Sequence, residues 1–166
     1  LCVASGPYAT VFHGQNEAVS LAFPEATHTD SETYILTDEQ AEKVEGAGRS
    51  ALATRLITIH RGWKGDAFLG YAHIDVHTVR TKAEAFMVVL GPDAEITQVR
   101  VLAFYEPLEY MPSGRWYQNF FGKGPGDDLR ISFDIDAVTG ATLTTRATVD
   151  SVRRMLAYYD VLLESD

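Results

Sequence analysis

Two apolar segments joined by a four-residue turn lie in the middle of the chain and most constrain its fold. Residues 84–90 and 96–105 are typical of strands, and Gly91-Pro-Asp-Ala94 between them has the composition of a hairpin turn. The other expected strands are 53–60 and 68–79, joined by a turn at 62–65, and a short one at 129–135. Strands joined by such short turns pair antiparallel. The sequence therefore predicts an antiparallel β-sheet.

Helical patterns flank this strand-rich middle. The clearest helix covers 145–163, where apolar or small residues recur every 3.6 residues and leave Arg153 and Arg154 facing solvent. A shorter helix is expected over 16–23, because Pro24 stops it. These helices and the antiparallel strands indicate an α+β domain: an antiparallel β-sheet with flanking helices and a long C-terminal helix.

Between the first helix and the first strand, the sequence predicts a loop and a capped helix. Residues 25–34 are polar and loop-like. In Thr37-Asp-Glu-Gln40, the Thr hydroxyl can accept from an early helix N–H while Gln reaches back, which is the pattern of a capping box. The helix that begins there is expected to be short, because Gly46 and Gly48 interrupt it.

Composition limits the class of protein. The chain has 166 residues, 14 Lys and Arg against 23 Asp and Glu, and a net charge of −9. This length suits a single domain, with a helical and loop segment over 1–50 and the core over 51–166. An acidic chain without a basic run is not expected to bind nucleic acid. Its longest apolar run, 85–90, is far shorter than the roughly 20 residues that cross a bilayer.

The single cysteine, Cys2, excludes an internal disulfide framework, a CxxC pair, c-type haem attachment and cysteine-rich zinc sites. The first residue is Leu, which is expected of a processed or truncated chain, and an export signal is one segment that could have preceded it. Cys2 is then either a lipid attachment point after a cleavage site or a tolerated terminal thiol.

The residues with the most chemical information are Asp136-Ala-Val-Thr-Gly-Ala-Thr-Leu-Thr144. A strand ends, a turn containing Gly140 follows, and a long helix begins. Free backbone N–H groups and hydroxyls at a helix N-terminus form a site for a phosphate group. The alternative is that Thr144 or Thr145 is simply the N-cap of the helix.

This segment also resembles a known family. Asp136-x-x-Thr-Gly-Ala-Thr142 is similar to the flavinylation motif of FMN-binding domains, which occur in the sodium-pumping NADH:quinone reductase, in the Rnf complex and in small exported flavoproteins. Ala137 stands where the family motif often has Gly. Residues 70–107 are similar to the family's central hairpin and its Glu-containing loop, and 120–123 to a segment before the motif. The resemblance covers 53–163.

The resemblance implies that FMN is attached covalently to Thr142 through a phosphoester bond. It implies that the phosphate loop includes Thr139, Gly140, Ala141, Leu143 and Thr144, that Asp136 orients the motif, and that Glu106 lies near the flavin. The neighbours of that glutamate, Tyr105 and Pro107, are included in the expected site. For Glu106, an exposed, paired side chain is the alternative. Aromatic residues before the motif either flank the flavin ring or fill the core: Tyr105, Tyr110, Trp116, Tyr117, Phe120 and Phe121.

The function implied by the resemblance is that of an extracytoplasmic electron carrier, periplasmic or on the cell surface, either free or tethered to a membrane. A separate flavin transferase would attach FMN, because no histidine lies beside Thr142 in the sequence to activate its hydroxyl. The electron partner would be a redox protein or a membrane electron-transfer complex. The alternative is a sensory or regulatory domain that binds FMN, or another phosphate ligand, non-covalently.

A weaker signal is His73-x-Asp75-x-His77 on an expected strand, where all three side chains share one face. Two imidazoles and a carboxylate suit a divalent metal, although closing the coordination sphere needs His60 or another element. The simpler interpretation is a solvated polar strand face.

Overall fold

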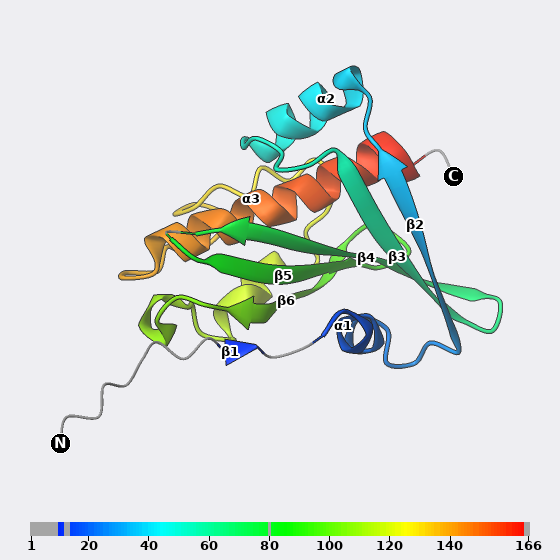
Figure 1. The fold of residues 1–166 in the computed structure, drawn as a ribbon, viewed down its shortest axis with the longest axis horizontal. Coiled ribbons are helices and arrows are strands. Elements are labelled where there is room, and N and C mark those ends of the chain that lie inside the picture. The colour runs from blue at the N-terminus through cyan, green and yellow to red at the C-terminus, as the bar shows by residue number, and fades with distance from the viewer. Residues whose placement is uncertain (1–9, 12–13, 80, 165–166) are drawn as a thin grey trace.

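The computed structural model describes residues 10–11, 14–79 and 81–164, and Cys2 lies outside them. Its centre is a six-stranded antiparallel sheet with the order β1-β6-β5-β4-β3-β2 (Figure 1). The strands are β1 (Thr10–Val11), β2 (His28–Ile35), β3 (Leu56–Lys64), β4 (Ala67–Thr78), β5 (Ala83–Leu90) and β6 (Ile96–Phe104). The helices are α1 (Gln15–Ala22), α2 (Asp38–Gly48) and α3 (Thr142–Tyr158), with short turns η1 (Leu108–Tyr110), η2 (Trp116–Phe120) and η3 (Tyr159–Leu163). The predicted α+β class is confirmed, and no helix within the described ranges has the length and apolarity to cross a membrane.

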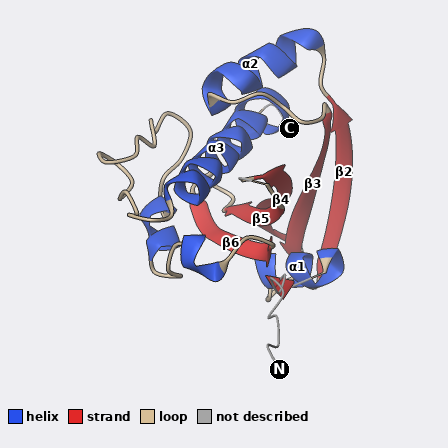
Figure 2. Cartoon of the chain, turned by 60° about the vertical axis from the view of Figure 1, so that its left-hand side comes forward, coloured by secondary structure: helices blue, strands red, loops and turns tan. Residues whose placement is uncertain are grey.

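Helices cover both faces of the sheet. Figure 2 shows α2 and α3 on one side and α1 on the other. The apolar run in β5 divides between these layers: Phe86, Val88 and Leu90 belong to the larger core with α2 and α3. Met87 and Val89 belong to a smaller core with α1. The run is continuous because this central strand is buried on both faces.

The C-terminal helix is confirmed, and it begins earlier than its apolar stripe suggests. α3 runs from Thr142 to Tyr158 and continues as the π-helical turn η3 to Leu163. The predicted solvent exposure of Arg153 and Arg154 is wrong. The Arg153 side chain is only 12% exposed, because it donates to the carbonyl oxygens of residues 128 and 129. Arg154 is 8% exposed, and its side chain packs between α3 and the sheet. The charge is accepted there because Asp75 on β4 pairs with it.

The capping box at Thr37 is confirmed: the hydroxyl accepts from the Gln40 N–H, and the Gln40 side chain accepts from the Thr37 N–H. The predicted short helix is confirmed, since α2 ends at Gly48, although it continues through Gly46 without a break. Packing explains the difference, because Ala41 and Val44 of α2 are buried in the larger core.

The prediction of a loop over 25–34 is wrong for most of these residues, because they form β2. This strand pairs with β3, from His28 opposite Trp63 to Ile35 opposite Leu56. β2 is an edge strand whose side chains are mostly exposed. Its residues are therefore polar, and the apolar alternation by which a strand is recognised is missing.

The turn expected over 62–65 lies further along, because β3 continues to Lys64 and β4 begins at Ala67. Gly62 and Gly70 face each other across the two strands, next to a shift in register. Gly70 has a φ of +138°, and a Cβ atom there would lie 2.0 Å from the carbonyl oxygen of Leu90. Gly70 is required because β4 approaches the backbone of β5 closely at this position.

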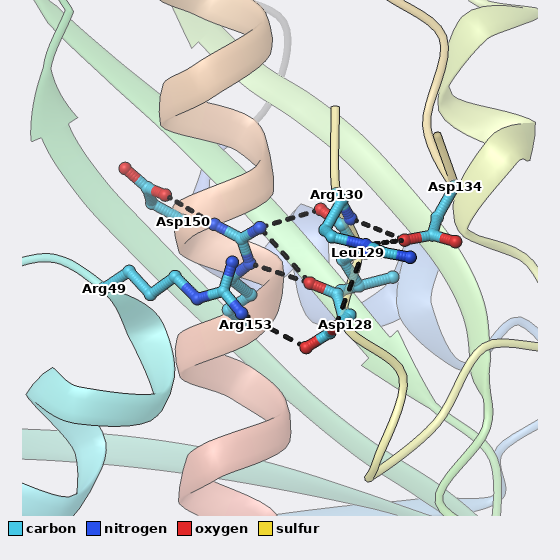
Figure 3. A network of polar contacts seen from close by, with 7 residues as sticks. All are labelled: Arg49, Asp128, Leu129, Arg130, Asp134, Asp150 and Arg153. Carbon is cyan, nitrogen blue, oxygen red and sulfur yellow. Dashed lines mark hydrogen bonds and ion pairs between the residues drawn. The ribbon is translucent and has the colours of Figure 1, made fainter. Parts of the chain in front are cut away.

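The short strand predicted at 129–135 is wrong. The described structure has only an isolated bridge between Ile131 and Ile135 there, inside a turn. Arg153 of α3 fixes this segment, since its guanidinium donates to the carbonyl oxygens of Leu129 at 2.8 Å and Asp128 at 3.2 Å (Figure 3). Arg49, at the end of α2, donates to the Asp128 carboxylate at 3.1 Å. These contacts hold the polypeptide that leads into α3.

Candidate functional site: the N-terminus of α3

The first turn of α3 has backbone N–H groups without a side-chain cap. Ala141 is the N-cap residue and makes no side-chain hydrogen bond. The alternative that Thr144 or Thr145 is the N-cap is wrong, because both residues lie inside the helix and are buried. The Thr144 carbonyl oxygen accepts from the Thr148 hydroxyl at 3.0 Å, and the Thr145 hydroxyl is buried without a partner in the described structure. The helix start is therefore open to an external acceptor.

The turn before the helix brings its backbone close to this end. Gly140 has a φ of +86°, and the space where a Cβ would stand is open. The Ala141 N–H donates to the Val138 carbonyl oxygen at 3.2 Å, which closes the turn. Trp116 holds its start, since the indole N–H donates to the Asp136 carbonyl oxygen at 2.7 Å. Asp136 and Thr139 themselves are exposed.

A pocket of about 190 Å³ opens at this helix end. Its lining residues are Val79, Glu106, Tyr110, Gly140, Ala141, Thr142, Leu143 and Thr144. Thr142, the first residue of α3, is exposed at this pocket. A pocket this size holds a phosphate group and its nearest atoms, but it is below the roughly 300 Å³ or more typical for a whole organic cofactor.

Glu106 is the residue that the pocket brings to the motif from a distant part of the chain. It is 7% exposed, so the alternative of an exposed glutamate is wrong. Its Oε1 accepts from the N–H groups of Thr81 at 2.9 Å and Lys82 at 3.0 Å, and from the Thr81 hydroxyl at 3.2 Å. Glu106 thus ties the β4–β5 loop to one wall of the pocket.

The other aromatic and neighbouring residues divide between pocket and core. Tyr110 lines the pocket, whereas Tyr105 and Pro107 do not. Three of the aromatic side chains before the motif are buried in the larger core: Trp116, Tyr117 and Phe120. Phe121 is 47% exposed. Of the expected site, the structure therefore brings together Glu106 and the segment 140–144, and leaves Asp136, Thr139, Tyr105 and Pro107 outside the pocket lining.

Beside Glu106 lies a buried acid that the sequence patterns did not single out. Glu84 on β5 is fully buried, and neither of its carboxyl oxygens has a partner among the described residues. Burial, and next the nearby charge of Glu106, raise the pKa of Glu84 to about 8. The alternating pattern of a strand was the available signal, because it places Glu84 on the same face as Phe86 and Val88.

The expectation of a solvated face at His73, Asp75 and His77 is wrong, since α3 covers these residues. Asp75 accepts hydrogen bonds from Ser151 and from Arg154, both on α3. Burial alone would raise the pKa of Asp75, but hydrogen bonds from His77 and Ser151 and the charge of Arg154 lower it well below its usual range. No group of three potential metal ligands occurs in the described part of the chain.

An α+β domain with an open helix N-terminus, a glycine turn before it and a small adjoining pocket has the features of a protein that binds a phosphate-bearing ligand. Residues 81–157 match the model of the FMN-binding domain family, and this confirms the resemblance found in the motif. The match extends from the β4–β5 loop into α3 and includes both Glu106 and Thr142. Comparison with curated proteins gives no match.

Proposed function

We propose that this protein is an extracytoplasmic electron carrier in which FMN is joined to Thr142 through a phosphoester bond. The observation that carries the proposal is the position of Thr142, which is exposed at the uncapped N-terminus of α3 and at the pocket beside Glu106. A phosphate on its Oγ1 atom would lie next to the free N–H groups of the first helical turn, which favour a negative charge.

The site suits a modified threonine. A phosphodiester at Thr142 carries one negative charge, and the first turn of α3 contains no acidic residue to repel it. The nearest carboxylate in the pocket lining, Glu106, already accepts three hydrogen bonds through Oε1. The open space at Gly140 leaves room for the phosphate to approach the backbone.

Attachment requires a separate flavin transferase, because the described residues of the pocket lining include no histidine that could activate the Thr142 hydroxyl. In the proposed transfer, an Oγ1–P bond forms at Thr142 and the pyrophosphate bond of FAD breaks. AMP is the leaving group, and the hydroxyl proton is released. The exposed position of Thr142 gives such an enzyme access to the acceptor atom.

When bound, FMN supplies the capacity to accept and release electrons. The N–H groups of the first turn of α3 would hold the phosphate end, and Leu143 of the pocket lining, 45% exposed, would offer an apolar contact to the rest of the group. Because Thr142 is exposed, a group attached to it would be accessible to a redox protein or a membrane electron-transfer complex. The net charge of −9 would attract a basic partner at low salt. The covalent bond would keep the cofactor from diffusing away outside the cytoplasm.

Mass spectrometry of protein produced with and without a flavin transferase tests this proposal. We expect an added mass of one FMN, less water, only with the transferase. Thr142→Ala should abolish it and Thr142→Ser should retain it, since Ser keeps the hydroxyl. Arg146→Ala, an exposed change on α3 outside the motif and the pocket lining, is the control for local disruption. Retention of the added mass in Thr142→Ala excludes the site, and yellow colour lost on denaturing filtration supports the non-covalent, sensory alternative.

A further inference from the structure

A second cavity lies between β3, β4 and the C-terminal part of α3, away from the pocket at the N-terminus of that helix. Its volume is about 490 Å³, within the range of small-molecule sites. Its lining includes His60, His73, Arg154 and Tyr158. Arg154 is 12 residues beyond Thr142 on one helix, about 18 Å at roughly 1.5 Å per residue. None of the residues that line this cavity also lines the pocket beside Thr142.

The cavity exists because β3 and β4 separate. The two strands pair from Lys64–Ala67 only as far as His60–Ala72. Beyond that point β3 continues to pair with β2, and β4 with β5, so their inner edges diverge (Figure 1). The His73 side chain reaches across this opening, and its Nδ1 atom lies 2.9 Å from the carbonyl oxygen of Thr58.

The hydrogen bond to Thr58 defines what His73 offers to the cavity. A carbonyl oxygen only accepts, so Nδ1 carries the proton. Burial lowers the pKa of His73, which keeps the ring neutral and leaves Nε2 as an acceptor. Within the described ranges, neither Nε2 nor the Tyr158 hydroxyl has a hydrogen-bond partner, and neither is among the fully buried unpartnered atoms. Both therefore face the cavity.

The ionisable side chains in the rest of the cavity lining leave no unpaired charge. The Arg154 guanidinium is paired with Asp75 at 2.5 Å and also donates to the Ser50 hydroxyl at 2.6 Å. Burial, and next the neighbouring His73, lower the pKa of His60. The mouth is apolar, since Leu56 and Val76 line the cavity and are 56% and 58% exposed. Such a cavity favours a neutral ligand over an ion.

We infer that this cavity is a binding site for a small neutral aromatic compound that carries a hydroxyl group. The hydroxyl donates to Nε2 of His73, and its oxygen accepts from the Tyr158 hydroxyl. The rings of His73 and Tyr158 meet edge to face, with centroids 5.1 Å apart, and the apolar residues at the mouth enclose the ligand ring. The inference does not depend on attachment of a flavin at Thr142.

Phenol, toluene and benzoate are suitable probes, because they share one ring and differ in the hydroxyl group and the charge. The experiment follows the methyl NMR signals of Ile57, Leu56 and Val76 in the full chain without flavin. We expect phenol to shift these signals saturably and to bind at least about tenfold more tightly than toluene, since each of its two hydrogen bonds contributes a factor of about five to ten. Benzoate should bind more weakly than phenol, because its charge has no free partner.

Two variants with a matched control locate the site. His73→Asn keeps a donor for Thr58 but removes Nε2, and Tyr158→Phe removes only the hydroxyl. Each should weaken phenol binding about five- to tenfold. Tyr159→Phe removes the adjacent hydroxyl on the same helical segment, outside this cavity, and should leave phenol binding unchanged. Equal affinities for phenol and toluene, tighter binding of benzoate, or unchanged phenol affinity in both folded variants would overturn the inference.

Discussion

Arg154 on α3 donates a hydrogen bond of 2.5 Å to the carboxylate of Asp75 on β4. Both side chains are mostly buried, with exposed fractions of 10% and 16%. The pair joins the C-terminal helix to the centre of the sheet, and Ser151 adds a second contact from the same helix. The helix whose first residue is Thr142 is therefore held by a polar contact as well as by its apolar stripe.

Removing one member of this pair should be costly. We expect Asp75→Ala to lower the free energy of unfolding by about 3–5 kcal/mol, because Arg154 is left as an uncompensated buried charge. Urea denaturation measures the effect. Asp128→Ala is the control, since its exposed ion pair with Arg49 should contribute less than about 1 kcal/mol. Similar losses in both variants would show that the buried pair has no special contribution.

Asp75 also predicts a loss of stability in acid. Its pKa is lowered in the folded protein, so its contribution is present above the unfolded carboxyl pKa and disappears as the pH falls through the folded value. The unfolding free energy of the parent should fall below about pH 4 more steeply than that of Asp75→Asn. Parallel curves for the two proteins would contradict the assignment.

Glu84 predicts the opposite dependence. Its pKa is raised to about 8 in the folded protein, so the neutral form is favoured there and ionises only at a cost. Stability should therefore fall as the pH rises from about 4.5 to 8. At about pH 9, Glu84→Gln should be more stable than the parent by on the order of 3 kcal/mol. The control is Glu42→Gln, an exposed change on α2. Its stability relative to the parent, measured by thermal unfolding, should not change across this pH range.

Two glycines in regular elements should respond in opposite ways to Ala. Gly70→Ala should destabilise the protein by more than about 3 kcal/mol, because the new Cβ meets the Leu90 carbonyl oxygen at 2.0 Å. Gly46→Ala should stabilise it by about 0.5–1 kcal/mol, since the position is helical with open space around it. The midpoints of urea unfolding test both, and a destabilised Gly46→Ala would contradict the helical environment.

Glu106 should control the order of the pocket wall. In Glu106→Ala, the N–H groups of Thr81 and Lys82 lose their acceptor, so their hydrogen exchange should accelerate about tenfold or more. Glu106→Gln keeps an acceptor oxygen and should retain part of the protection. The Ile96 amide, bonded to the Lys123 carbonyl oxygen, serves as the internal reference. Unchanged hydrogen exchange at Thr81 and Lys82 would contradict the prediction that Glu106 orders the pocket wall.

Local patterns predicted the elements whose own residues carry the signal. The capping box at Thr37 depends on contacts within four residues, and the hairpin between β5 and β6 depends on its turn and two apolar strands. β2 was missed because an exposed edge strand is identified by pairing with β3 and lacks an apolar pattern of its own. Arg154 was misplaced because its partner, Asp75, is 79 residues away.

The sequence by itself determined the α+β class, the strand order along the central hairpin and the FMN-binding motif, because each is written in short-range spacing of residue types. The tertiary structure decided that Glu106 joins the motif at one pocket, that Glu84 is buried beside it, and that β3 and β4 separate to form a second cavity. These features depend on long-range packing, which fixes the burial and the partners of a charged side chain and leaves no local trace in the sequence.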